Sequence, residues 1–259
     1  MKLPVQLIST DFDGTLFAEF ENPPVPRALE DQLSWLQQRG ATWVINTGRD
    51  LSSLMESIAR ARLTIRPDYI VVVEREIYRH HDHHYEPVPE WNDQCTRDHQ
   101  SVFAEVQAAL TEVTAWVEEH FDADVYTDSY SPFCLIARNN QDADAIQNRF
   151  AKFCLRFPRL SFVRNDVYAR LSHVAYNKGT ALAEICRRVN VTAEHVLAAG
   201  DHLNDLPMLS REFARWLVAP SNAVPQVKAQ VLKQDGYVSH QHCGHGVAKG
   251  LELLLRGLR

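Results

Sequence analysis

Two aspartates, Asp11 and Asp13, lie one residue apart directly after an apolar run at residues 5–9. Gly14 and Thr15 follow them at once. Two carboxylates at the end of a buried strand are unfavourable, because repulsion and desolvation both raise the free energy of their charged forms. A bound divalent cation removes that penalty, and a carboxylate beside it can act as a nucleophile or as a general acid and base. This stretch is therefore our first candidate for a reactive centre.

Three further groups of polar residues lie at the ends of other regular patterns. They are Thr47, Gly48 and Arg49 after residues 42–46, Lys178 at the head of a helical pattern over residues 178–189, and Gly200, Asp201, Asn204 and Asp205 after residues 196–199. Aspartates that meet at one edge of a sheet repel one another unless a cation lies among them. Ligands that are all oxygen favour a hard ion, and a site that also serves a phosphate favours Mg²⁺.

The elements that position these residues alternate between strand and helix. Apolar runs at 5–9, 42–46 and 69–73 predict strands, and the amphipathic patterns at 27–39 and 51–61 predict helices between them. The order strand, helix, strand, helix, strand predicts an α/β fold with a doubly wound, mostly parallel, Rossmann-like sheet. In such sheets ligands bind beyond the carboxyl ends of the strands, which is where the polar groups fall.

The middle of the chain breaks this alternation. Its predicted elements are a linker at 86–91, helices near 98–120 and 142–155, and strands near 133–137, 160–164 and 167–171. The alternation returns with the helix from Lys178, strands at 196–199 and 216–219, a short helix after Asp205 and a last helix at 246–256. We therefore expect a core made of residues 1–88 and 173–259, interrupted by an α+β cap domain at 89–172.

Composition narrows the class of protein. The 259 residues are 45% hydrophobic and 23% charged, as in a globular protein. The net charge of −6 argues against nucleic-acid binding, and no apolar stretch approaches the roughly 18 residues that span a bilayer. The 5 cysteines show no CxxC spacing, and the start of the chain does not read as a secretory signal. We expect a cytoplasmic protein without a membrane partner, either a monomer or a homodimer.

The four polar groups resemble the motifs of the haloacid dehalogenase (HAD) superfamily of phosphohydrolases. They occur in the family's order, as DFDGT, the threonine of NTGR, the lysine of NKGTAL and GDHLND, and the cap falls between the second and third. Within the family, the sequence is most similar to the sucrose-phosphatase-like branch, followed by the Cof-type sugar phosphatases. The phrases RPDYIVVVEREIY and NKGTAL support that similarity.

The resemblance implies a role for each residue. Asp11 would be the nucleophile that forms an aspartyl-phosphate, and Asp13 would be the general acid and base, which points to a phosphatase. The implied Mg²⁺ ligands are Asp11, Asp13 through its backbone carbonyl, Asp201, and Asp205 either directly or through another ligand. The implied contacts to the phosphoryl group of a small substrate come from Thr15, Thr47, Gly48, Arg49, Lys178 and Asn204. The cap would exclude water and choose a sugar phosphate similar to sucrose 6-phosphate.

The sequence departs from the family pattern in two places. The loop after the third strand, which usually contains glycine or Asn-Gly, reads Val73-Glu74-Arg75-Glu76. The segment before the lysine has His173 where a proline is common. Both segments border the substrate side of such folds, so the resemblance implies a sugar phosphate more broadly than sucrose 6-phosphate itself.

Other features leave two interpretations open. The basic residues of the second half of the cap, Arg149, Lys152, Arg156, Arg159, Arg164 and Arg170, form either a solvated surface or, in part, a phosphate contact. The histidines of residues 80–84 and 240–245 lie either in an exposed hairpin tip and a loop, or at a second metal. The alternatives to a phosphatase are a phosphotransferase or phosphomutase of the same superfamily and a non-catalytic sugar-phosphate-binding regulator.

Overall fold

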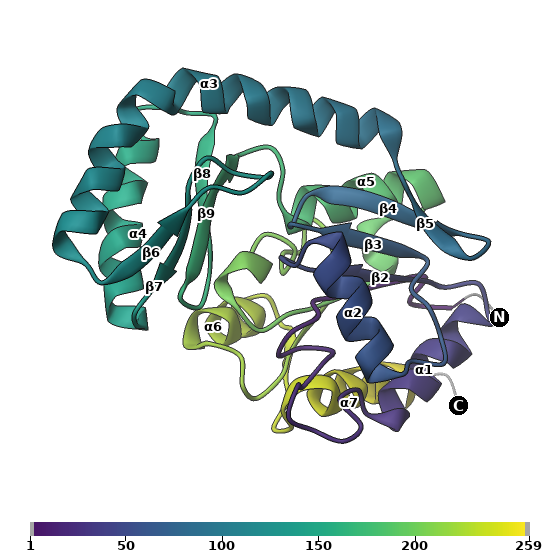
Figure 1. Cartoon of the computed structure of the whole chain (residues 1–259). Coiled ribbons are helices and arrows are strands. Elements are labelled where there is room, and N and C mark those ends of the chain that lie inside the picture. Colours follow the sequence, from purple (N-terminus) through teal and green to yellow (C-terminus); the bar gives the residue numbers. More distant parts are fainter. Residues whose placement is uncertain (1–2, 257–259) are drawn as a thin grey trace. The chain divides into compact units, whose positions relative to one another are not determined.

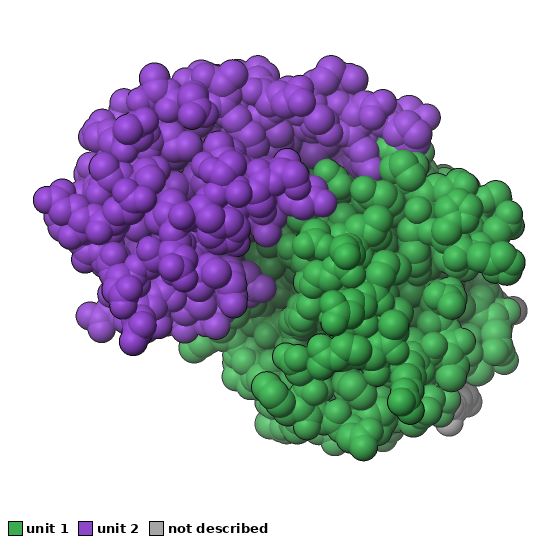
Figure 2. Space-filling model, in the orientation of Figure 1, with its two compact units in different colours: residues 1–88, 178–259 green, residues 89–177 purple. Residues whose placement is uncertain are grey.

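The computed structural model describes residues 3–256 of the chain, which divides into two compact units (Figures 1 and 2). We call residues 1–88 and 178–259 the core unit and residues 89–177 the cap unit. The second boundary falls at 177/178 and not at the expected 172/173. Residues 173–177 stay with the cap because the backbone N–H of His173 donates to His99 Nε2 and the Tyr176 hydroxyl donates to Asp98.

The core unit contains an eight-stranded sheet in the order β12-β11-β10-β1-β2-β3-β4-β5. Its strands are β1 (Leu7–Thr10), β2 (Thr42–Asn46), β3 (Tyr69–Val72), β4 (Glu76–His81), β5 (His84–Pro87), β10 (Val196–Ala199), β11 (Trp216–Ala219) and β12 (Tyr237–Val238). Strands β12 through β3 are parallel, and β4 and β5 form an antiparallel hairpin at one edge. The predicted mostly parallel sheet is confirmed.

Helices cover both faces of this sheet, with α1 and α2 on one face and α5 on the other (Figure 1). The helices of the core unit are α1 (Arg27–Gln37), α2 (Leu51–Ala61), α5 (Lys178–Val189), α6 (Pro225–Lys233) and α7 (Cys243–Leu255). Helix α1 buries Leu29, Leu33 and Leu36, the stripe expected from its apolar spacing. Strands β1, β3 and β10 are buried along their whole length, as parallel strands covered on both faces must be.

The register of the central strands brings their carboxyl ends together. Thr10 pairs with Ala199 on one side and with Ile45 on the other. Strand β2 ends at Asn46, and Asp11 and Gly200 directly follow β1 and β10. All three residues therefore lie at the same edge of the sheet. The sequence motifs meet there because the strands are parallel and in register.

The cap unit is a four-stranded antiparallel sheet with two helices. Its elements are α3 (Pro89–His120), β6 (Ala123–Tyr126), β7 (Cys134–Ala137), α4 (Asn140–Cys154), β8 (Leu160–Asn165) and β9 (Tyr168–His173), with sheet order β6-β7-β9-β8. Apolar residues of α3, among them Val102, Val106 and Val113, form one buried cluster with Phe133 and Phe150. The expected inserted α+β architecture is confirmed.

Several predicted boundaries are wrong. The expected linker at 86–91 is instead the end of edge strand β5 and the first turn of α3, which begins at Pro89 and not near residue 98. Proline is compatible both with an edge strand and with a first helical turn, so its presence did not indicate a linker. The short helix expected after Asp205 is a 3-10 turn over Leu203–Asp205. The elements β6, α6 and β12 were not predicted.

The basic residues of the cap do not share one role. Arg164 is buried, donates to Asp144 and Gln147 and to the Asp166 carbonyl, and so holds β8 to α4 rather than facing solvent. Arg159 pairs with Glu105 at 2.7 Å, where both side chains are about half exposed.

In the part of the chain that the structure describes, residues 3–256, no helix is long and apolar enough to cross a bilayer.

Candidate active site

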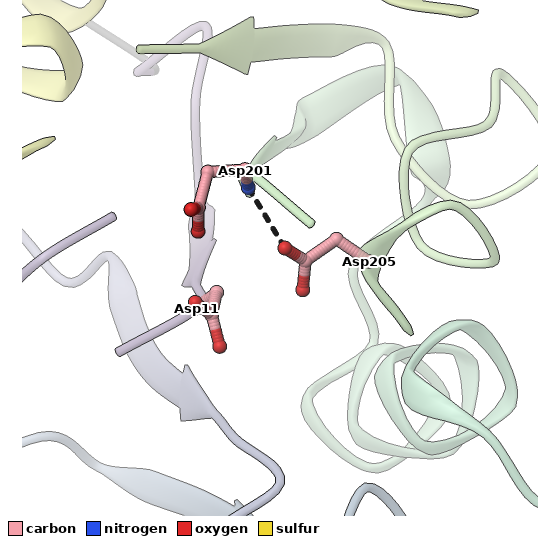
Figure 3. A group of neighbouring side chains, drawn as sticks. All are labelled: Asp11, Asp201 and Asp205. Atoms are coloured by element: carbon pink, nitrogen blue, oxygen red, sulfur yellow. Dashed lines mark hydrogen bonds between the residues drawn. The ribbon is translucent and has the colours of Figure 1, made fainter. Parts of the chain in front are cut away.

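Three carboxylates meet at the carboxyl edge of the core sheet (Figure 3). Asp11 follows β1, and Asp201 and Asp205 belong to the loop after β10. One oxygen from each lies within 4.8 Å of the others, and no other trio of acidic, histidine or cysteine side chains in residues 3–256 does so. Burial, and then the charge of Asp205, raise the pKa of Asp11 well above its usual value and that of Asp201 to about 7.

Lys178 lies fully buried at the start of α5, and its positive charge partly compensates the negative charge of the three carboxylates. Its ammonium donates to Asp11 Oδ1 and to Asp205 Oδ1, each at 2.6 Å. Burial lowers the pKa of the Lys178 ammonium, but the charges of Asp11, Asp205 and Glu74 raise it further, so the net shift is upward. The helix start is held in place because Asn46, at the end of β2, donates to the Lys178 carbonyl at 2.9 Å.

Asp205 organises the loop that contains Asp201. Its Oδ2 accepts hydrogen bonds from the backbone N–H of Asp201 at 2.8 Å and of His202 at 2.9 Å. Both oxygens of this fully buried side chain are therefore engaged, one by Lys178 and one by the loop. This arrangement indicates that Asp205 positions Asp201 and does not itself bind the metal.

Asp201 is held by residues of two other loops. Thr15 Oγ1 donates to Asp201 Oδ1 at 2.7 Å, and Asn222 Nδ2 donates to Asp201 Oδ2 at 3.3 Å and to the Gly14 carbonyl at 2.8 Å. Gly14 has φ of 73°, and a Cβ there would lie 2.5 Å from Asp201 Oδ2. Only glycine permits this approach. Thr15, expected at the phosphate, is thus bound to Asp201, and Asn222 was not identified from the sequence.

The donor set fits a hard divalent cation. Asp11 and Asp201 offer carboxylate oxygens in a buried, like-charged cluster, and the single ammonium of Lys178 does not balance three carboxylates. Oxygen ligands with excess negative charge are the chemistry that Mg²⁺ requires. The carboxylate of Asp13 is not part of the cluster that Asp11, Asp201 and Asp205 form. The ligand expected from Asp13 is its backbone carbonyl, not its side chain.

Asp13 is instead clamped by Arg49. Arg49 Nε donates to Asp13 Oδ2 at 2.6 Å and Nη2 donates to Asp13 Oδ1 at 2.7 Å, which is the bidentate geometry of a strong charged pair. Arg49 Nη1 donates to Ser53 and Ser57 on α2 at 2.9 and 3.0 Å. All three guanidinium nitrogens are therefore engaged. This indicates that Arg49 orients Asp13, and it does not favour the expected contact between Arg49 and phosphate.

This clamp predicts how Arg49 variants behave. Arg49→Lys cannot form the bidentate pair, so kcat for an alkyl phosphate is expected to fall about 10–100-fold as Asp13 loses its orientation, with a smaller change in KM. The loss with p-nitrophenyl phosphate should be smaller, because p-nitrophenolate leaves without protonation. Steady-state kinetics on both esters measures this. A raised KM at unchanged kcat would instead show that Arg49 binds the phosphate.

The remaining predicted residues, Thr47, Gly48 and Asn204, lie in the segments that follow β2 and β10. Thr47 is buried, and its Oγ1 accepts from the Arg49 backbone N–H at 3.2 Å. Asn204 Nδ2 donates to Glu74 Oε1 at 2.8 Å, and a Cβ at Gly48 would lie 3.2 Å from the same Glu74 oxygen. Glu74 was noted in the sequence only as a departure from the family pattern, because its position gave no sign that its carboxylate turns into the site.

The histidine tracts do not gather three ligand atoms within 4.8 Å anywhere in residues 3–256. His81 and His84 flank the tip of the β4–β5 hairpin and both face Glu86, at 3.6 and 3.0 Å. His242 and His245 both contact Glu21, His245 at 3.7 Å. One tract lies at the exposed hairpin tip, and the other lies at the start of α7, where His242 directly precedes the helix and His245 is in its first turn.

Comparison with known proteins extends over nearly the whole chain. The family model described as sucrose-6F-phosphate phosphohydrolase matches residues 4–254. The chain is 26% identical over 263 residues to the 5-amino-6-(5-phospho-D-ribitylamino)uracil phosphatase YcsE of Bacillus subtilis (strain 168), covering 95% of this chain and 94% of that protein.

Solved structures share the fold. The sucrose-phosphatase of Synechocystis sp. PCC6803, solved in complex with sucrose and phosphate, has a TM-score of 0.71 at 17% identity and covers 98% of both chains. A haloacid dehalogenase-like hydrolase of Bacteroides thetaiotaomicron has a TM-score of 0.64 at 19% identity, covering 96% of this chain and 99% of that one.

The fold, the site and these similarities define a phosphatase of the haloacid dehalogenase superfamily, a phosphoric monoester hydrolase. The chain belongs to the sucrose-6F-phosphate phosphohydrolase family.

Proposed function

We propose that the protein hydrolyses a small, hydroxyl-rich phosphomonoester in a Mg²⁺-dependent reaction that passes through an aspartyl-phosphate on Asp11. The observation that supports this most directly is the convergence of Asp11, Asp201 and Asp205 on one buried point, with Lys178 bridging two of them. A cluster of this charge has little structural value, and it matches the needs of phosphoryl transfer.

In the first half-reaction, an oxygen of Asp11 attacks phosphorus and the bond from phosphorus to the leaving oxygen breaks. Lys178 donates to Asp11 Oδ1 and so orients the carboxylate for this attack. Asp13, oriented by Arg49, transfers a proton to the leaving oxygen, and the dephosphorylated alcohol departs. Thr47 and Lys178 supply a hydroxyl and a positive charge for the other phosphoryl oxygens.

In the second half-reaction, Asp13 takes a proton from water as that water attacks the phosphorus of the aspartyl-phosphate. The bond from phosphorus to Asp11 breaks, inorganic phosphate leaves, and Asp13 has regained the proton that it gave up in the first step. The same residue therefore serves as acid and then as base, which restores the enzyme without an additional reactant.

The residues that would hold Mg²⁺ are Asp11 and Asp201, with the backbone carbonyl of Asp13. Bound there, the ion supplies neutralisation of the charge on the phosphoryl oxygens and on the carboxylates. Thr15 and Asn222 keep Asp201 directed at this point, and Asp205 holds the loop on which Asp201 lies.

The substrate class follows from the relatives. The family model is named for a sucrose phosphate, and the Bacillus relative is named for a phosphorylated ribityl compound. Both names describe a phosphate ester on a hydroxyl-rich leaving group. We therefore propose a sugar or polyol phosphate, with sucrose 6-phosphate as one member of the class to be tested.

The test is phosphate release from a panel of sugar and polyol phosphates with and without Mg²⁺. Hydrolysis of at least one member at a kcat/KM of about 10⁴ M⁻¹s⁻¹ or more is expected. Product analysis with added sugar acceptors separates hydrolysis from phosphoryl transfer. The proposal fails if no phosphate is released from any member, or if the phosphoryl group goes mainly to the acceptor.

Removal of the metal gives a further prediction. Treatment with a chelator is expected to abolish turnover, and added Mg²⁺ should restore it. Added Mg²⁺ should also raise the thermal unfolding temperature, because the ion binds the folded state and not the unfolded state. Asp201→Asn should weaken both the activation and the thermal shift. Asp235→Asn, far along the chain and outside the cluster, is the matched control and should respond to Mg²⁺ as the wild type does. Full activity in chelator would contradict the metal dependence.

A further inference from the structure

Glu74 occupies a backbone position that suits glycine. It follows β3 with φ of 67°, and Val73 before it has φ of 44°. Two consecutive side-chain-bearing residues in the left-handed region are costly, above all when one is β-branched. Hydrogen bonds from the Val73 N–H to the Arg49 carbonyl (2.8 Å) and from the Glu74 N–H to the Thr47 carbonyl (2.9 Å) hold the turn. Such strain at a site calls for a functional reason.

The Glu74 carboxylate is buried, with only 8% of the residue exposed, and is fixed by one oxygen. Oε1 accepts from Asn204 Nδ2 at 2.8 Å, whereas Oε2 accepts no hydrogen bond from residues 3–256. Because a carboxylate can only accept, it also determines which way the Asn204 amide faces. Asn204 Oδ1 is buried and has no partner within the described residues. Asn204 Oδ1 is thus a buried acceptor without a donor, and Glu74 Oε2 beside it is free to accept a hydrogen bond.

This carboxylate lies within the proposed phosphate site. Its Oε1 is close enough to Gly48 that a Cβ there would approach to 3.2 Å, and its charge acts on Lys178. Asn204, to which it is hydrogen-bonded, directly precedes Asp205 in the loop that also contains Asp201. A negative charge here opposes binding of the phosphoryl group itself, so its use must concern another part of the substrate.

We propose that Glu74 is a specificity-determining residue, whose carboxylate accepts hydrogen bonds from hydroxyl or amino groups of the leaving group and disfavours leaving groups that bear a second anionic group. This inference rests on the proposed phosphatase function. A buried acceptor that is left unpaired by a poor substrate gives strong discrimination, stronger than an apolar pocket provides. A purely structural role is a weaker account, because glycine would make the same turn without strain.

The test compares three kinds of ester. They are the hydroxyl-bearing monophosphate that the wild type hydrolyses fastest, p-nitrophenyl phosphate, whose leaving group has no donor, and fructose 1,6-bisphosphate. The variants are Glu74→Gln, which keeps the shape without the charge, and Glu74→Gly, which removes the carboxylate and the strain. Glu76→Gln is the matched control, since that carboxylate accepts from Tyr78 at 3.1 Å and is not a member of the acid cluster.

In both Glu74 variants, the ratio of kcat/KM for the hydroxylated ester to that for p-nitrophenyl phosphate is expected to fall about tenfold or more. The preference for the monophosphate over the bisphosphate should fall in parallel, while Glu76→Gln retains both ratios. If both ratios stay at wild-type values in a folded Glu74→Gln protein, the inference is overturned. If the wild type releases phosphate from none of the esters, the proposed function has failed instead.

Discussion

Asp11→Asn is expected to lower kcat for phosphate release by about 10⁴-fold or more, because the amide cannot form the phosphoryl-enzyme bond. The change is nearly isosteric, so the loss reports chemistry. The amide oxygen of the variant would still accept from Lys178 in place of Asp11 Oδ1, and the position of α5 should not change. Rapid-quench experiments with ³²P-labelled substrate should show a labelled wild type and an unlabelled variant.

The stability of the same variant separates catalysis from folding. Burial and the charge of Asp205 raise the pKa of Asp11, so its ionised form destabilises the metal-free protein near neutral pH. Removing that charge should leave the metal-free unfolding temperature unchanged or higher. Activity near that of the wild type, or incorporation of label elsewhere in the chain, would refute Asp11 as the nucleophile.

Lys178→Met is expected to give the largest loss of stability. The ammonium is fully buried and pairs with Asp11 and Asp205 at 2.6 Å each, so its removal leaves uncompensated buried carboxylates. Breaking one side of a buried ion pair costs about 3–5 kcal/mol, or roughly 6–20 °C in unfolding temperature for a chain of this size. Differential scanning calorimetry of the metal-free protein measures the change, and turnover should be lost as well.

A double variant identifies the cause. Lys178→Met combined with Asp205→Asn removes one positive and one negative charge, and is expected to recover part of the stability that the single variant loses. The deficit of the single variant should also grow as pH rises, since protonation of the carboxylates relieves their repulsion. A single variant as stable as the wild type at pH 8 without metal would contradict the electrostatic account of this site.

Much of the core could be read from the sequence because local and global signals agree there. The apolar runs that became β1, β2, β3 and β10 are buried strands, and strands of this kind are parallel and covered on both faces. Once they are parallel, residues after their ends must meet at one edge. Asp11 and Asp201 come together for this reason alone, although 190 positions separate them in the numbering.

The bounds of helices and strands were harder to predict from the sequence where one residue type is compatible with two conformations. Pro87 and Pro89 read as a linker but lie in an edge strand and a first helical turn. Arg164 reads as surface charge, but the strand register turns it inward to Asp144 and Gln147. For Arg164 the deciding contacts come from α4, which is a separate element, so the local pattern of β8 does not contain them.

By itself, the sequence determined the parallel core, the inserted cap and the residues that supply charge to the site, because these depend on hydrophobic period and on residue type after each strand. Only the tertiary structure decided what each polar side chain touches. It paired Arg49 with Asp13 and turned the carboxylate of Glu74 toward Asn204. Hydrogen bonds are short and directional, so their pairing depends on ångström-scale positions that are set by the packing of the whole core.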